Sequence, residues 1–93
     1  MGSRGRTGQR EDARRLKVRY DWLESFSDDE LGELVFLRES DPMEPNEEYF
    51  DISNPEMGVM SGKEGQRADE GSRYVPKSQV PDHVWEKLVG PFR

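Results

Sequence analysis

The uneven distribution of charge along the chain most limits how its 93 residues can fold. Residues 1–19 carry seven Lys or Arg side chains and two acidic ones, whereas residues 20–93 carry seven and eighteen. A segment with so much charge and so few apolar side chains has little surface to bury. We therefore expect residues 1–19 to form a basic, flexible arm, helical at most from about residue 9, and residues 20–93 to form one small acidic domain.

A domain of this size buries a modest fraction of its surface and is marginally stable. The chain has no cysteine, so neither a disulfide bond nor a thiolate zinc site can reinforce it. Two Trp, three Tyr and four Phe residues are spread along the sequence and can anchor a small core. Stability must then come from packing, from oligomerisation or from a partner.

The clearest local signal is the segment FSDDELGELVFL at residues 26–37. Ser27 is a favourable N-cap residue, and Glu30 follows three positions later, which is the spacing of a capping box. Acidic residues in the next turn suit the positive end of the helix dipole. This pattern predicts a helix over residues 28–38 that ends before Pro42.

A second amphipathic helix is predicted near the end of the chain. Val80, Val84 and Leu88 recur at intervals of four residues, which places them on one helical face. The predicted helix covers residues 80–89, and we expect Gly90 to end it in a left-handed conformation.

Three short segments rich in aromatic or β-branched residues read as strands, at residues 48–53, 58–60 and 73–76. The sequence thus predicts a small α+β domain, in which two amphipathic helices pack on a short irregular β-hairpin or a small antiparallel sheet. The residues that we expect to form the core are Phe26, Leu31, Leu34, Val35, Phe50, Tyr74, Val84, Trp85 and Leu88.

The arm is the main candidate for binding a partner. Its cations could pair with the phosphates of a nucleic acid, with an acidic protein surface or with the acids of this chain itself. We also expect residues 1–19 to be removable with little effect on thermal stability. The partner-binding residues predicted here are Arg4, Arg6, Arg10, Arg14, Arg15, Lys17 and Arg19.

Signals for catalysis or metal binding are weak. His83 and Glu86 would share a helical face, but an exposed histidine in a first turn explains them equally well. The acidic run at residues 28–33 lacks the pattern of a calcium loop, and residues 58–64 lack the spacing of a phosphate-binding loop. We therefore expect no catalytic residue, no metal ligand and no cofactor.

Tyr74 and Trp85 alternate with basic residues and could stack on bases or dock a peptide. The interpretation that we favour places both rings in the core, where the last strand meets the last helix.

The function expected from these observations is that of a non-enzymatic accessory or interaction module acting through protein–protein contacts, with a protein partner or a homodimer. The alternative is a nucleic-acid-associated or ribonucleoprotein-associated protein that uses the basic arm, and the third class is a small enzyme. No segment has the apolar length of a membrane span or an export signal, so the cytoplasm is the expected location.

Overall fold

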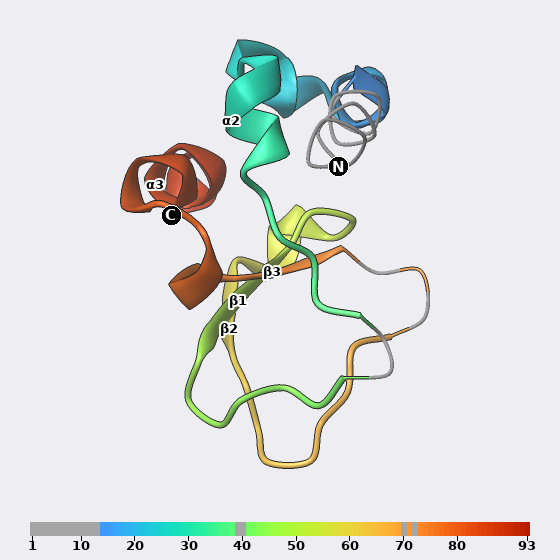
Figure 1. Ribbon diagram of the computed structural model, residues 1–93, viewed down its shortest axis with the longest axis vertical. Helices are drawn as coiled ribbons and strands as arrows, with labels where there is room; N and C mark the ends of the chain where they lie inside the picture. Colours follow the sequence, from blue (N-terminus) through green and yellow to red (C-terminus); the bar gives the residue numbers. More distant parts are fainter. Residues whose placement is uncertain (1–13, 39–40, 70, 72) are drawn as a thin grey trace, which may run out of the picture. The chain divides into compact units, whose positions relative to one another are not determined.

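The structure is a computed structural model, which describes residues 14–38, 41–69, 71 and 73–93 (Figure 1). By its internal contacts the chain divides into two compact units, Met1–Leu34 and Val35–Arg93. The fold is α+β, as the sequence predicted, because the second unit combines a three-stranded antiparallel sheet with a helix. The predicted boundary at residue 19 stays a prediction.

The described part of the first unit consists of three short helical segments. Residues 14–19 are α-helical, η1 spans Asp21–Ser25 and α2 spans Asp28–Gly32. The predicted capping box is confirmed: the Ser27 backbone N–H donates to Glu30 Oε1 at 2.8 Å, and the Glu30 N–H donates to Ser27 Oγ at 3.0 Å. The predicted helical content at residues 9–13 lies outside the described residues.

The α2 helix is shorter than the predicted helix over residues 28–38, because it ends at Gly32. Glycine costs about 1 kcal/mol relative to alanine within a helix, which weakens the continuation. A competing interaction lies further along, where the Leu37 N–H donates to the Tyr74 carbonyl oxygen at 2.8 Å. The chain around Leu37 thus hydrogen-bonds to a strand of the second unit instead of continuing the helix.

The sheet forms from the three segments that the sequence predicted. Strand β1 spans Glu48–Asp51, β2 spans Val59–Ser61 and β3 spans Tyr74–Pro76, with the short 3-10 helix η2 at Pro55–Met57 between β1 and β2. The strand order is β2-β1-β3, and both pairings are antiparallel. The central strand β1 therefore joins two edge strands that are distant in sequence.

Both faces of this sheet pack against other parts of the second unit. Tyr49 on one face belongs to a buried cluster with Met43, Ala68 and Tyr74. Successive side chains of a strand point to opposite faces. Phe50 accordingly lies on the other face, where its ring centroid is 5.7 Å from that of Phe92.

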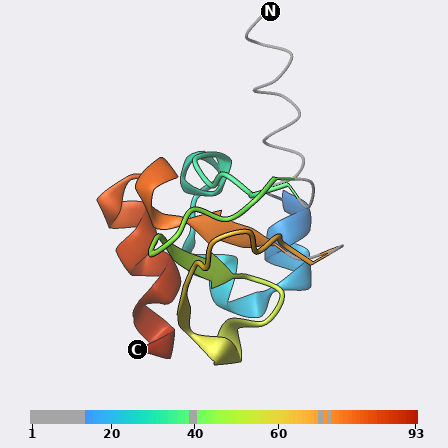
Figure 2. The same ribbon diagram turned by 90° about the horizontal axis from the view of Figure 1, so that it is seen from below.

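The segment that carries Phe92 runs through η3 (Lys77–Gln79), α3 (Asp82–Val89) and η4 (Gly90–Phe92). Figures 1 and 2 both show α3 beside the sheet. The predicted left-handed stop at Gly90 is wrong, because this residue has φ −50° and ψ −47° and the chain continues into η4.

Burial agrees with most of the predicted core. Tyr74 and Trp85 are 7% and 0% exposed, so both rings are core residues and not a binding surface. Val35 is the exception among the predicted core residues, with 39% of its surface exposed. Residues 1–19 were expected to have little surface to bury, but Leu16 is buried, with 7% of its surface exposed.

Candidate functional site

The seven cations predicted to bind a partner divide into two groups. Four of them, at positions 14, 15, 17 and 19, lie in the helical segment of residues 14–19, and the other three lie outside the described residues. The structure contains no partner, so the binding role of all seven stays a prediction. The two groups are Arg14, Arg15, Lys17 and Arg19, and Arg4, Arg6 and Arg10.

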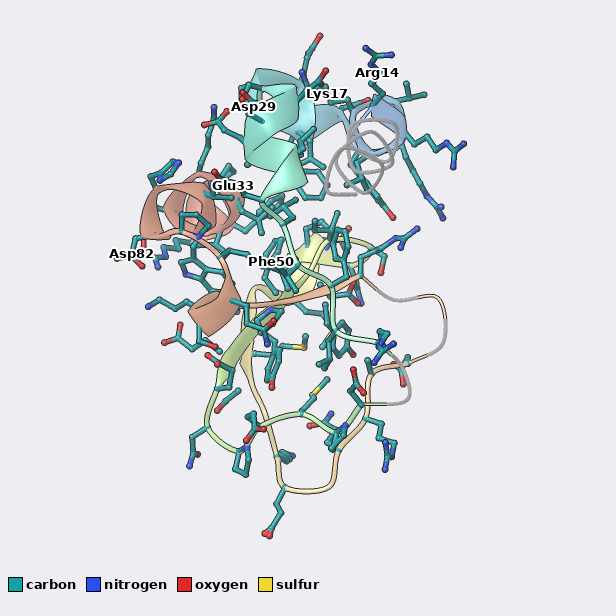
Figure 3. The ribbon with its side chains drawn as sticks, viewed as in Figure 1. Arg14, Lys17, Asp29, Glu33, Phe50 and Asp82 are labelled. Carbon is teal, nitrogen blue, oxygen red and sulfur yellow. The ribbon has the colours of Figure 1, made fainter. Side chains whose placement is uncertain are left out.

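Two cations of the helical segment face an acid of their own unit. Arg14 Nε lies 3.8 Å and Lys17 Nζ lies 3.9 Å from the carboxylate of Asp28, at the first position of α2. Figure 3 shows Arg14 and Lys17 together with Asp29, the next residue of α2. Arg19 lies over the Tyr20 ring, with its guanidinium carbon 5.6 Å from the ring centroid. The basic segment thus engages acidic and aromatic side chains of this chain itself.

His83 is exposed on α3. Glu86, which would share its helical face, forms a two-point ion pair with Arg93 at 2.9 and 3.2 Å. The carboxylate of Glu86 is therefore already bound. Among the described residues, no group of three or more His, Cys, Asp or Glu side chains is arranged to hold a metal ion.

The buried carboxylate of Asp51 has a local structural explanation. Its Oδ1 atom accepts hydrogen bonds from the backbone N–H groups of Ser53 at 3.0 Å and Arg73 at 3.1 Å. These bonds fix the turn after β1 and the entry to β3. Burial, followed by the negative charges of Asp69 and Asp51, raises the pKa of the Tyr74 hydroxyl group above its ordinary value.

The outer edge of β2 emerges as a candidate site from the hydrogen-bond pattern of the sheet. The Gly62 N–H donates to the Glu47 carbonyl oxygen at 2.8 Å, so the backbone groups of Gly62 point toward β1. In an antiparallel pair, residues alternate between bonding to the neighbouring strand and pointing away from it. Met60 therefore bonds to β1, whereas the N–H and C=O groups of Val59 and Ser61 point outward.

The opposite edge of the sheet is protected. The Ile52 N–H donates to the Arg73 carbonyl oxygen at 3.0 Å, and the same alternation then points the backbone groups of Tyr74 and Pro76 outward. Leu37 donates to the Tyr74 carbonyl oxygen, and Pro76 has no N–H to leave unpaired. Within the described part of the chain, β2 pairs only with β1 and has no comparable cover.

Exposed apolar side chains occur on β2 and just before it. Met57 in η2 and Val59 in β2 are 61% and 38% exposed. Sequence reasoning identified residues 58–60 as a strand but did not single out this edge as a site. The sequence did contain a signal for this edge. The edge strand β3 contains Pro76, and proline protects an edge strand from further pairing, whereas β2 contains no proline.

Glutamates are frequent in the sequence just before and after β2 and in the segment that leads into and includes its partner strand β1. Glu48 pairs with Ser61 in the sheet register, and the Glu47 carbonyl group bonds to Gly62. Lys63 follows β2 closely, and Lys77 lies 3.8 Å from a carboxylate oxygen of Glu48. We call the following set the edge glutamates: Glu44, Glu47, Glu48, Glu56 and Glu64.

No family model matches the chain, and no curated protein and no solved structure shows significant similarity to it. Across the described residues, the helices are all too short or too polar to span a bilayer.

Proposed function

We propose that this protein is a non-enzymatic interaction module that contacts another polypeptide through the outer edge of β2. The observation that carries the proposal is the pair of outward-pointing residues Val59 and Ser61, on a strand that pairs, among the described residues, with β1 alone. An edge strand offers unpaired N–H and C=O groups to an added strand. Peptide recognition by strand addition uses such an edge, with main-chain hydrogen bonds supplying affinity.

The exposed side chains at this edge support the same proposal. Val59 on β2 and Met57, two residues before it, are both exposed apolar side chains. Proteins commonly protect a sheet edge, as Leu37 and Pro76 do for β3. The difference between the two edges of one small sheet favours a binding role for the edge at β2, which no described segment covers.

The alternative, a nucleic-acid-associated protein, depends on the basic residues of the arm. It receives less support, because Arg14 and Lys17 already lie near Asp28. The acidic domain would also repel a polyanion, since residues 20–93 carry eighteen acids and seven Lys or Arg. A small enzyme that pairs His83 with Glu86 would require Glu86 to give up its ion pair with Arg93.

A photo-crosslinking amino acid can test the proposal in cells that express the protein. We would place it at position 59 in one variant and at position 35 in a second, because Val59 and Val35 are 38% and 39% exposed. The proposal predicts a crosslinked polypeptide from position 59 and none of comparable yield from position 35. Crosslinks to nucleic acid at position 59, or equal crosslinks from both positions, would contradict it.

A further inference from the structure

Resting on the proposed function, we infer that the partner presents an extended basic segment, which adds to β2 as a fourth strand. The main-chain geometry supplies the first part of the argument. Val59 and Ser61 each direct one N–H and one C=O outward. A single antiparallel strand can satisfy all four groups, because residues with this spacing form the hydrogen-bonded positions of one ladder.

The charge of the partner follows from the charge of the domain that carries the edge. Residues 20–93 carry eighteen acidic residues against seven Lys or Arg, and in the sequence Glu56 precedes β2 and Glu64 follows it. Lys63 and Lys77 offset only part of this charge, and Lys77 is already 3.8 Å from Glu48. Opposite charges across neighbouring strands stabilise a pair and like charges destabilise it. Basic side chains on the added strand would therefore meet favourable partners.

The same charges argue against a second copy of this chain as the occupant. Pairing β2 with the β2 of another molecule would bring two domains of the same negative charge together. Each strand also contains only three residues, Val59–Ser61, so the contact would be small. A stable dimer usually buries more than about 1,000 Å² in total, which such an edge contact alone would not reach.

The side chains at the edge indicate the pattern that the partner should have. Val59 lies on the same face as Phe50, its partner in the register, and it remains 38% exposed. A directly opposed apolar side chain on the added strand would cover it. Because side chains alternate between faces, an apolar residue at every second position with basic residues between them fits best.

A contact of this size belongs to the weak, transient class of interactions. Its electrostatic part arises between exposed groups, so added salt should screen it. The hydrogen bonds to Val59 and Ser61 are less sensitive to salt. Binding should consequently weaken with ionic strength while the bound position of the peptide on β2 stays the same.

The test uses the full chain and two synthetic peptides with blocked ends, one alternating Lys and Val over seven residues and one alternating Glu and Val. Amide NMR spectra report both the affinity and the position of binding. We expect the Lys–Val peptide to bind at least tenfold more tightly than the Glu–Val peptide. We also expect it to slow hydrogen exchange at the amides of Val59 and Ser61.

Two matched substitutions test whether the peptide binds at the edge of β2 or elsewhere on the surface. Val59→Lys should weaken binding of the Lys–Val peptide at least tenfold, whereas Val35→Lys, at an equally exposed position, should change it less than twofold. Ser61→Pro removes one outward N–H without removing a bond to β1, and should also weaken binding. Thermal melts of each variant verify that the fold is retained. If Ser61→Pro unfolds, the comparison of Val59→Lys with Val35→Lys still tests the inference.

Three results would overturn the inference. Equal or tighter binding of the Glu–Val peptide at the same amides would refute a basic partner and leave the proposed function standing. Binding of the Lys–Val peptide without protection of Val59 and Ser61 would refute strand addition. If neither peptide binds, the inferred partner chemistry is wrong, while crosslinking from position 59 separately decides the proposed function.

Discussion

Gly62 lies so close to Tyr49 that a Cβ atom added to the glycine would stand 2.7 Å from Cε2 of the tyrosine ring. The same added atom would also collide with the carbonyl oxygen of Glu44. The Tyr49 hydroxyl group is fixed in turn, because it accepts a hydrogen bond from the Glu44 N–H at 2.6 Å. Backbone and ring thus enclose Gly62 at the end of β2.

Gly62→Ala should therefore destabilise the protein by about 1–3 kcal/mol, the usual cost of forcing extra volume into a packed site. Thermal or urea denaturation measures this loss. Gly32→Ala is the matched control, since beyond its chain neighbours and its own helix backbone no described atom lies within 4 Å of the position of its Cβ, and alanine should stabilise α2 by up to about 1 kcal/mol. Equal effects of the two substitutions would contradict the enclosure of Gly62.

Tyr74 predicts a dependence of stability on alkaline pH. Its raised pKa means that the folded state keeps the phenolic proton at pH values where the unfolded chain, with a tyrosine pKa of about 10, has begun to lose it. The stabilising contribution is therefore fully present below pH of about 10 and falls as the pH rises through the folded-state pKa.

Urea denaturation at a series of pH values above about 9 tests this dependence. The wild-type protein should lose stability with rising pH more steeply than Tyr74→Phe, which has no proton to release. Parallel curves for the two proteins would show that Tyr74 does not contribute to the alkaline loss.

Trp85 is fully buried, and within the described residues its indole N–H has no hydrogen-bond acceptor. Trp85→Ala should cost about 3–5 kcal/mol, as expected for truncating a large buried ring. Trp85→Phe keeps a ring and removes the unsatisfied N–H, whose burial costs about 1–3 kcal/mol. We expect Phe to lose less than half the stability that Ala loses. Melting of Trp85→Ala at the wild-type temperature would exclude a core role for this residue.

The burial of Leu16 changes what a truncation should do. Removing residues 1–13 should leave the melting temperature within a few degrees, because Leu16 and the ion pairs of Arg14 and Lys17 with Asp28 remain. Removing residues 1–19 should lower it clearly. Most of the loss should come from Leu16, since exposed ion pairs contribute only about 0–1 kcal/mol.

Two point substitutions in the full chain isolate this effect. Leu16→Ala should destabilise the protein by about 2–5 kcal/mol. Val18→Ala should have almost no effect, since Val18 is 85% exposed. If both variants melt at the wild-type temperature, Leu16 is not a structural anchor and the whole arm is separable.

The features that the sequence determined by itself depend on residues close together in the chain. The capping box joins Ser27 and Glu30, which are three residues apart, so its geometry follows from the helix turn that it begins. The three strands and the face of α3 likewise follow from short patterns of aromatic and β-branched residues. These local signals also place Trp85 and Tyr74 among the buried residues.

The tertiary structure decided the features that depend on partners distant in sequence. The end of α2 at Gly32 accompanies a hydrogen bond between Leu37 and Tyr74, which no local pattern specifies. The identity of the open edge depends on the strand order β2-β1-β3 and on the register that turns Val59 and Ser61 outward. Only pairing across the sheet fixes that register, because a shift by one residue would exchange the inward and outward backbone groups.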